Sequence, residues 1–262
     1  MNTRLEHLRA VMARLRDKET GCPWDIVQDF KSIVPYTIEE AYEVADAIDR
    51  GHMRDLKEEL GDLLLQVVYH AQMAEEQGMF TLDDVAESVA NKMISRHPHV
   101  FGDQKARTAE DVTHIWDAQK YAEKPQKNSV LDGVTRGLPA LLRAEKLQKK
   151  AAKVGYVWPD TASAFHKLEE ELAEFKSALE QGDAAHQDEE WGDILFCLVN
   201  YARMNGMNSE ESLRRASAKF ERRFKGMEAA LKEDGYADLT QITLEIWLDY
   251  WKKQKNLESS TE

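Results

Sequence analysis

An acidic pattern that occurs twice limits what this chain can fold into more than any other feature of its sequence. In the first copy two acids lie three residues apart, and sixteen residues later two more lie three apart; these are Glu40, Glu43, Glu59 and Asp62. The second copy repeats the same steps with Glu171, Glu174, Glu190 and Asp193. Acids three residues apart share one face of a helix. Each copy therefore predicts two neighbouring helices that bring four carboxylates together.

The rest of the sequence favours an all-α protein. Helix breakers are scarce, with 13 glycines and 6 prolines in 262 residues, and the helical period of 3.6 dominates the apolar positions. Thr37, followed by Glu40 three residues later, predicts the N-cap of a helix, and Thr81 with Asp84 predicts another. We expect helices over residues 3–16, 37–49, 54–77, 81–98, 108–123, 139–153, 162–181, 184–205, 210–233 and 243–257.

Further features recur in the same order as the acids, which indicates a duplicated helical unit. A glycine lies between the acids of the second pair in each copy, at Gly61 and Gly192. The other repeated features are Trp24-Asp25 with Trp158-Pro159-Asp160, Lys92 and Arg96 with Lys219 and Arg223, and Trp116 and Lys120 with Trp251 and Lys255. We predict two tandem homologous helical-bundle domains, over residues 1–124 and 139–262, joined by a linker at 125–138. Glycine inside a helix costs roughly 1 kcal/mol against alanine, so its repetition suggests a close approach of the backbone to a neighbouring helix or a bound ligand.

The charge and the apolar pattern exclude several classes of partner. A formal net charge of −13 argues against a broad nucleic-acid-binding surface, which requires a basic footprint. No apolar run approaches the roughly 20 residues that a membrane-spanning helix needs. The first residues carry charges throughout and do not look like a signal peptide, so we expect a cytoplasmic protein with no membrane partner.

Four converging carboxylates favour a bound cation. Two like charges 4 Å apart repel by about 4 kcal/mol at an effective dielectric constant of 20. Mg²⁺ suits ligands that are all oxygen atoms, with Mn²⁺ as a substitute, and it commonly retains substrate phosphate in its coordination shell. Zinc is disfavoured because no Cys or His falls within the pattern, and a di-iron site is disfavoured because no histidine follows a Glu by three residues.

Basic and aromatic residues near the C-terminus complement a metal-bound polyphosphate. Lys219 and Arg223 share a helix face with Arg222 beside them, and an arginine can clamp a phosphate with two donors. Trp251 and Lys255 offer a stacking surface and another cation. A simpler alternative for the basic residues is an exposed, charged helix face without a ligand. For Trp251 the simpler alternative is a side chain packed in the core. Lys167 and His186 lie close to the second acidic set in the sequence and are further candidates for ligand contact.

The second acidic set, Glu-Glu-x-x-Glu followed after fifteen residues by Glu-x-Gly-Asp, resembles the MazG family of nucleoside triphosphate pyrophosphohydrolases. Residues 21–25, Gly-Cys-Pro-Trp-Asp, and residues 96–101, Arg-His-Pro-His-Val-Phe, are similar to the N-terminal half of its two-domain members. The resemblance covers essentially the whole chain. It implies an all-α fold of the NTP pyrophosphatase type, a homodimer, and Mg²⁺-dependent hydrolysis of NTPs and dNTPs to the monophosphate and pyrophosphate, with a housecleaning role in the nucleotide pool.

The resemblance also assigns residues, mainly in the C-terminal copy, which is generally the catalytic one in two-domain members. Its metal ligands fall on Glu171, Glu174, Glu190 and Asp193, with Glu40, Glu43, Glu59 and Asp62 as the second copy. The nucleotide-binding set that we expect is Lys167, Glu170, His186, Glu189, Lys219, Arg222, Arg223, Trp251 and Lys255. The segment from His186 to Glu189 departs from the family pattern, which leads us to expect a lysine near its start.

For the reaction we expect a metal-activated water to attack the α-phosphorus, with Glu171 or Glu174 accepting its proton. Two alternatives remain open at this point. One is a narrower dUTP or dCTP pyrophosphatase. The other is a non-catalytic helical module for dimerisation or protein interaction.

Overall fold

A computed structural model describes residues 4–123 and 128–259, and these residues form helices joined by turns, with no strand among them. The chain divides into two compact units, Met1–Gln126 and Lys127–Glu262. The expected all-α class with tandem helical units is confirmed. Residues 124–127, which include the start of the predicted linker, lie outside the described residues, and 128–138 form turns. None of the described helices is both long and apolar enough to cross a membrane.

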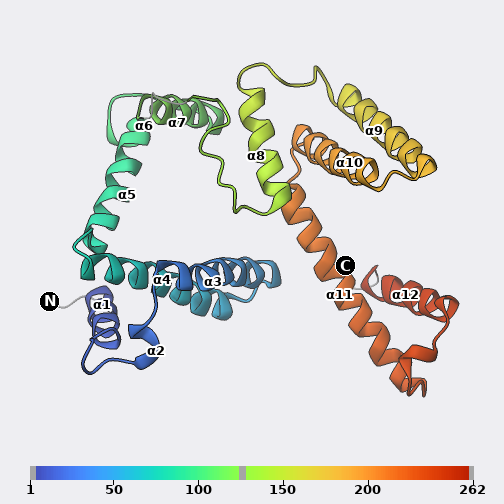
Figure 1. Cartoon of the computed structure of the whole chain (residues 1–262), viewed down its shortest axis with the longest axis horizontal. Helices are drawn as coiled ribbons and strands as arrows, with labels where there is room; N and C mark the ends of the chain where they lie inside the picture. The colour runs from blue at the N-terminus through green and yellow to red at the C-terminus, as the bar shows by residue number, and fades with distance from the viewer. Residues whose placement is uncertain (1–3, 124–127, 260–262) are drawn as a thin grey trace. The chain divides into compact units, whose positions relative to one another are not determined.

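Unit 1 is organised around a hairpin of two long helices, α3 (Phe30–Arg50) and α4 (Met53–Glu76), which lie side by side (Figure 1). Its remaining helices are α1 (Arg4–Leu15), α2 (Pro23–Ile26), α5 (Leu82–Arg96), α6 (Pro98–Phe101) and α7 (Ala109–Glu123). The buried core joins α1, α3, α4 and α5 through Met12, Ile33, Val68, Tyr69, Ala71, Met73 and Leu82. The hairpin is therefore anchored at the end where α3 begins and α4 ends.

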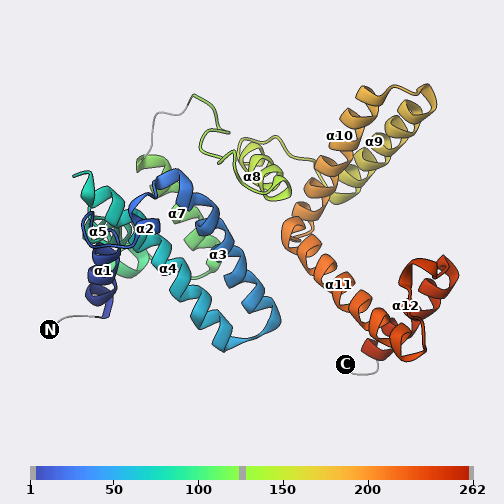
Figure 2. The same ribbon diagram turned by 60° about the horizontal axis from the view of Figure 1, so that its bottom comes forward.

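Unit 2 repeats this hairpin with α9 (Thr161–Gln181) and α10 (Ala184–Met204), preceded by α8 (Ala140–Ala152). The long helix α11 (Ser209–Glu233) follows, and after a short 3₁₀ turn (Leu239–Gln241) the helix α12 (Leu244–Ser259) packs back against it. Met227, Leu231 and Tyr250 form the core of this contact. Figure 2 shows α12 beside the part of α11 that is remote from the α9–α10 hairpin.

The two hairpins begin and end in the same way. An aspartate caps each first helix: Asp29 accepts hydrogen bonds from the N–H groups of Lys31 and Ser32, and Asp160 accepts one from the N–H of Ser163. Each of these helices is 21 residues long, and each ends at a glycine in the left-handed region, Gly51 (φ 68°) and Gly182 (φ 73°). The duplication seen in the acids therefore extends to the signals that start and stop the helices.

The structure corrects the predicted start of the first hairpin helix. Thr37 is not an N-cap, because α3 begins seven residues earlier at Phe30 and continues through Pro35. The Thr37 hydroxyl lies inside the helix and donates to the carbonyl of Ile33 at 3.3 Å. The capping box made by Asp29 and Ser32 is the stronger start signal. The predicted cap of α5 is confirmed, since Thr81 and Asp84 form a reciprocal capping box.

One proposed pair of repeated residues is also wrong. Asp25 lies in α2, is 9% exposed, and accepts a hydrogen bond from the Tyr69 hydroxyl at 3.0 Å. Asp160 instead caps α9. The residue of unit 1 that matches Asp160 is Asp29, so the similarity of Trp24-Asp25 to the segment ending at Asp160 does not reflect a shared position. The short helices α2 and α6 were also not expected.

Candidate metal and nucleotide site

The α9–α10 hairpin brings three of the predicted acids of unit 2 together. Glu171 and Glu174 come from α9 and Glu190 from α10, and each offers an oxygen that lies within 4.8 Å of the other two. Glu171 is 7% exposed and Glu190 9%, whereas Glu174 is exposed to solvent. Asp193 is exposed one turn further along α10 and does not belong to this close set. The pKa of the Cys197 thiol is raised mainly by burial and next by the charge of Glu171, and the charge of Asp193 makes a smaller contribution in the same direction.

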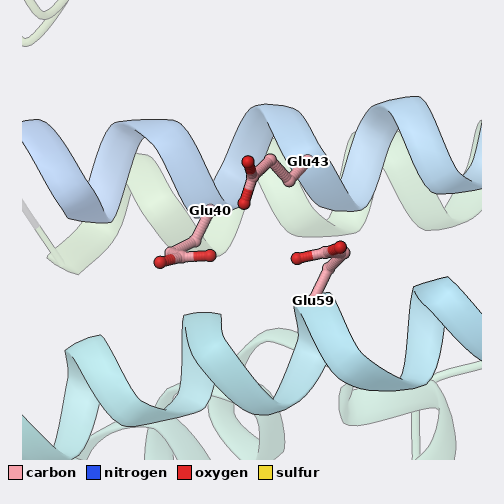
Figure 3. Close-up of side chains that lie close together, drawn as sticks. All are labelled: Glu40, Glu43 and Glu59. Carbon is pink, nitrogen blue, oxygen red and sulfur yellow. The ribbon is translucent and has the colours of Figure 1, made fainter.

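The α3–α4 hairpin of unit 1 builds the same cluster. Glu40 and Glu43 lie on α3 and Glu59 on α4, as Figure 3 shows, and each offers an oxygen within 4.8 Å of the other two. Burial, followed by the charges of Asp62 and Glu43, raises the pKa of Glu40 above its ordinary value. Burial and then Glu43 and Asp62 likewise raise the pKa of Glu59. Asp62 is thus a neighbour of this cluster rather than part of the close set.

Among the described residues, basic side chains contact the acidic cluster of unit 2 and none contacts that of unit 1. The Lys167 ammonium contacts Glu171 at 2.9 Å and Glu170 at 3.1 Å, and these hydrogen bonds raise the pKa of Lys167 and lower that of Glu170. His186 Nε2 lies 2.9 Å from Glu190. The side chains of Lys167, Glu170 and His186 therefore lie beside the acidic cluster of unit 2, whereas Glu189 is exposed.

The corresponding positions in unit 1 hold different residues. Lys167 precedes Glu171 by four residues, and the residue four before Glu40 is Tyr36. His186 precedes Glu190 by four, and the residue four before Glu59 is Asp55. Asp55 adds to the negative charge that raises the pKa of Glu59. The two clusters therefore share their geometry but differ in local charge.

The unit 2 residues fit a hard divalent cation. The buried Oε2 atom of Glu190 has no hydrogen-bond donor among the described residues, and a buried carboxylate oxygen without a partner is costly. The close set offers carboxylate oxygens only, and such ligands are typical of Mg²⁺ and Mn²⁺. Glu171, Glu174 and Glu190 are therefore the residues that would hold the ion.

The repeated glycines Gly61 and Gly192 do not serve helix packing in the described parts of the chain. A Cβ atom built on Gly61 or Gly192 would have no neighbouring atom within 4 Å in the described parts of the chain. Of the two expected reasons, the close approach to another helix is therefore not seen among the described helices. The open space beside Gly61 and Gly192 is compatible with the other expected reason for a glycine there, which is the approach of a bound ligand.

The predicted basic residues of unit 2 gather on α11 and α12. Arg223 contacts Glu258 at 2.6 Å, and its guanidinium carbon lies 5.4 Å from the centroid of the Trp251 ring. Arg222 also contacts Glu258, at 2.9 Å. Lys219 and Lys255 are exposed. No hydrogen bond or ion pair between described residues joins this basic group to the acids of the hairpin, so the structure shows two groups rather than one.

Glu258 is a residue that the sequence analysis missed. A signal was present, because a glutamate follows the repeated tryptophan by seven residues in both copies, at Glu123 and Glu258. In unit 1 Arg96 contacts Glu123 at 2.6 Å and lies over the Trp116 ring at 5.1 Å.

The family model for the MazG nucleotide pyrophosphohydrolase domain matches residues 28–101 and 160–227, which contain both acidic hairpins. This chain belongs to the MazG family. The resemblance drawn from the acidic motifs is thereby confirmed, and the chain is a member of an enzyme family that hydrolyses acid anhydrides. Both matched segments begin within a residue of the aspartate caps, so the family pattern coincides with the structural repeat.

Full-length relatives support the assignment to MazG. A nucleoside triphosphate pyrophosphohydrolase of Escherichia coli is 44% identical over 258 residues, which cover 97% of this chain and 98% of the relative. A nucleoside triphosphate pyrophosphohydrolase/pyrophosphatase MazG of Thermotoga maritima is 43% identical over 251 residues, 95% of each chain. An uncharacterised protein of Bacillus subtilis, YabN, is 44% identical over 252 residues, but these make up only 51% of its length.

Proposed function

We propose that this MazG protein hydrolyses nucleoside triphosphates, both NTPs and dNTPs, to the nucleoside monophosphate and pyrophosphate, and that it requires Mg²⁺ or Mn²⁺. The observation that carries the proposal is the convergence of Glu171, Glu174 and Glu190 within 4.8 Å, with one buried oxygen of Glu190 unpartnered. The names of the full-length relatives support the substrate class. Asp193 joins the set as a fourth ligand through water or a change of side-chain rotamer.

In the proposed reaction a water oxygen attacks the α-phosphorus and the bond from that phosphorus to the bridging oxygen breaks, which releases pyrophosphate. When bound, Mg²⁺ lowers the pKa of water and offsets the charge of the triphosphate. Glu171 or Glu174 accepts the proton of the attacking water. Glu170 supports this step by holding the Lys167 ammonium, which Glu171 also contacts.

The nucleotide side of the proposed site is the basic group of α11 and α12. Lys219, Arg222 and Arg223 bind the phosphates and balance the charge that moves onto the leaving pyrophosphate. Trp251 stacks with the nucleotide, and Lys255 adds a positive charge. Lys167, His186 and Glu189 contact the substrate from the α9–α10 hairpin.

We assign catalysis to unit 2, because Lys167 and His186 there provide positive or neutral partners beside the acids. In unit 1 the matching residues are Tyr36, which is neutral, and Asp55, which pairs with Arg50 at 2.7 Å, so among the described residues no cation contacts the close acids that would face a triphosphate. Unit 1 retains the carboxylates for metal binding, so we propose that its copy binds the ion but turns over little nucleotide.

We further propose a cytoplasmic homodimer that removes unwanted nucleotides and binds neither nucleic acid nor membrane. The hairpin of unit 2 exposes apolar side chains over both helices, among them Leu172, Leu179, Trp191 and Leu195, which are 38–50% exposed. Burial of such side chains against a second copy would contribute roughly 25 cal/mol per Å² of apolar area. The dimer would also bring together the acidic and basic groups that do not contact each other within one chain.

The experiment that tests the function is a panel of NTPs and dNTPs with detection of released pyrophosphate, in Mg²⁺ and in EDTA. We expect broad turnover that EDTA abolishes. Glu174→Gln and Asp193→Asn should lower kcat/KM by at least about 100-fold while the helical circular dichroism is retained. Glu169→Gln, an exposed acid of α9 outside the cluster, is the matched control.

The same panel separates the alternatives. Turnover restricted to dUTP or dCTP would replace the broad specificity with the narrower enzyme. If no nucleotide is hydrolysed, and tryptophan fluorescence shows no saturable change with Mg²⁺ and nucleotide, the chain is a helical interaction module instead. Near-normal rates in both acidic variants would contradict the assignment of the site.

A further inference from the structure

A single carboxylate organises the basic group of unit 2. Glu258 lies in the last turn of α12 and is 30% exposed at its side chain. Its Oε1 accepts a hydrogen bond from Nε of Arg222 at 2.9 Å. Its Oε2 accepts from Nε of Arg223 at 2.7 Å and contacts Nη2 of the same residue at 2.6 Å. The position of both arginines is thereby fixed relative to α12.

The contact leaves a defined part of Arg223 available. Glu258 occupies the edge of the guanidinium formed by Nε and Nη2, and Trp251 lies under its face. Nη1 has no hydrogen-bond acceptor among the described residues. The side chain is only 15% exposed, so the guanidinium is held within the α11–α12 contact. A guanidinium held in this way presents its free N–H groups in one orientation, which suits recognition of a phosphate oxygen.

Unit 1 contains the same arrangement, formed independently. Arg96 donates from Nε and Nη2 to Glu123 Oε2 at 3.1 and 2.6 Å and lies over the ring of Trp116. The arginine and tryptophan are 20 residues apart in unit 1 and 28 in unit 2. Because the connecting segments differ in length, the shared contact does not follow from a shared loop. What the two units keep is the spacing of seven residues from the tryptophan to the glutamate.

We propose that Glu258 is a positioning residue for nucleotide binding, which holds Arg223, with Arg222 beside it, in the orientation that contacts the phosphates. This inference rests on the proposed function and extends it to a residue outside the predicted site. A free arginine loses much rotamer freedom when it binds a ligand, and the ion pair removes that freedom before the nucleotide arrives. Glu258 is well suited to this role, since its hydrogen bonds with Arg223 and then Arg222 lower its pKa and keep it ionised at neutral pH.

A competing role gives the opposite prediction. If Glu258 occupied the donors that the triphosphate needs, it would have to be displaced, and its removal would strengthen nucleotide binding. Removal of one negative charge near the phosphates acts in the same direction. A positioning residue instead weakens binding when it is removed. The sign of the change in KM therefore decides between the two roles.

The test is steady-state hydrolysis of ATP with Mg²⁺ by the full chain, comparing wild type, Glu258→Gln and Glu258→Asp. We expect Glu258→Gln to raise KM by about tenfold with kcat changed by less than about twofold, because a charge-assisted contact is lost without touching the reacting atoms. Glu258→Asp keeps the charge and should give an intermediate KM. Glu221→Gln is the control, since it removes the same charge from an exposed pair with Lys225 on α11 and should leave both constants unchanged.

A double-mutant cycle tests whether Glu258 acts through Arg223. In an Arg223→Gln background, Glu258→Gln should raise KM by well under tenfold, because only the contact of Glu258 with Arg222 is then left to lose. An unchanged or lowered KM in Glu258→Gln, or a full tenfold effect in the Arg223→Gln background, overturns the inference while wild-type turnover leaves the proposed function intact. Wild-type protein that neither binds nor hydrolyses nucleotide overturns both. Thermal melts of each variant exclude unfolding as the cause of a raised KM.

Discussion

Glu174→Gln should stabilise the chain without metal and destabilise it, relative to wild type, with metal. The oxygens of Glu171, Glu174 and Glu190 lie within 4.8 Å of one another. Two unit charges at about this distance repel by roughly 1 kcal/mol in water, the relevant medium for an exposed side chain. Glu174 takes part in two such pairs. Screening at about 0.1 M salt, where the Debye length is about 10 Å, and the Lys167 ammonium beside Glu171 reduce the total to at most about 1 kcal/mol.

The substitution loses no hydrogen bond in exchange. Lys167 and His186 contact Glu171 and Glu190, and Glu174 has no partner of this kind among the described side chains. In EDTA we therefore expect Glu174→Gln to raise the melting temperature by about 3 °C, since 1 kcal/mol shifts a unit of this size by a few degrees. At a Mg²⁺ concentration of 100 times its Kd, wild type gains about 2.7 kcal/mol. The variant, with one ligand fewer, should gain much less.

The assay is a pair of calorimetric melts for each protein, one in EDTA and one in saturating Mg²⁺. The order of the two melting temperatures should reverse between the two conditions, and the difference seen in EDTA should shrink at high salt. Glu169→Gln serves as a control that should follow wild type in both. A variant that melts below wild type in EDTA, or that gains as much from Mg²⁺ as wild type does, would refute the idea that the three carboxylates form one repelling, cation-binding cluster.

Three further predictions concern stability. Arg16→Met should lower the free energy of unfolding by about 3 kcal/mol in urea melts, because the 8% exposed Arg16 side chain contacts Glu76 at 2.8 Å and its loss leaves a partly buried charge; a loss below about 1 kcal/mol would show that the pair contributes little. Burial acts to raise the pKa of Glu76, but the hydrogen bond with Arg16 lowers that pKa below its ordinary 4.5. The ion pair therefore stabilises the fold above pH 4.5, and its contribution is lost as the pH falls through the folded-state pKa of Glu76. Wild type should lose stability below pH 4.5 more steeply than Arg16→Met, and parallel curves of stability against pH would contradict this. Gly192→Ala should raise the unfolding free energy by about 1 kcal/mol, because its Cβ meets no atom within 4 Å; destabilisation in calorimetry would mean that a neighbour does pack there.

The hairpins and the close acidic sets were accessible from sequence because their signals are local and repeated. Helical spacing places Glu171 and Glu174 on one face, and the intervening Gly182 forces the turn that returns Glu190 to them. The start of α3 was not accessible in the same way. Pro35 and Thr37 resemble the beginning of a helix, but the capping box at Asp29 and the burial of Ile33 favour an earlier start.

Contacts between distant helices were harder to predict. The pairing of Arg223 with Glu258 depends on how α12 returns along α11, which no local spacing determines. The burial of Asp25 under Tyr69 depends in the same way on the position of α2, a helix too short to give a periodic pattern.

The aspartate cap and the left-handed glycine of each hairpin constrain how its sequence can change. Glu171 stands eleven residues after Asp160, and Glu190 stands eight after Gly182; Glu40 and Glu59 keep the same intervals from Asp29 and Gly51. With 3.6 residues per turn, insertion or deletion of one residue inside either interval would swing an acid by about 100° around its helix axis. Point substitutions can therefore accumulate along these helices during evolution, whereas a single insertion or deletion between the fixed ends would move an acid out of the cluster.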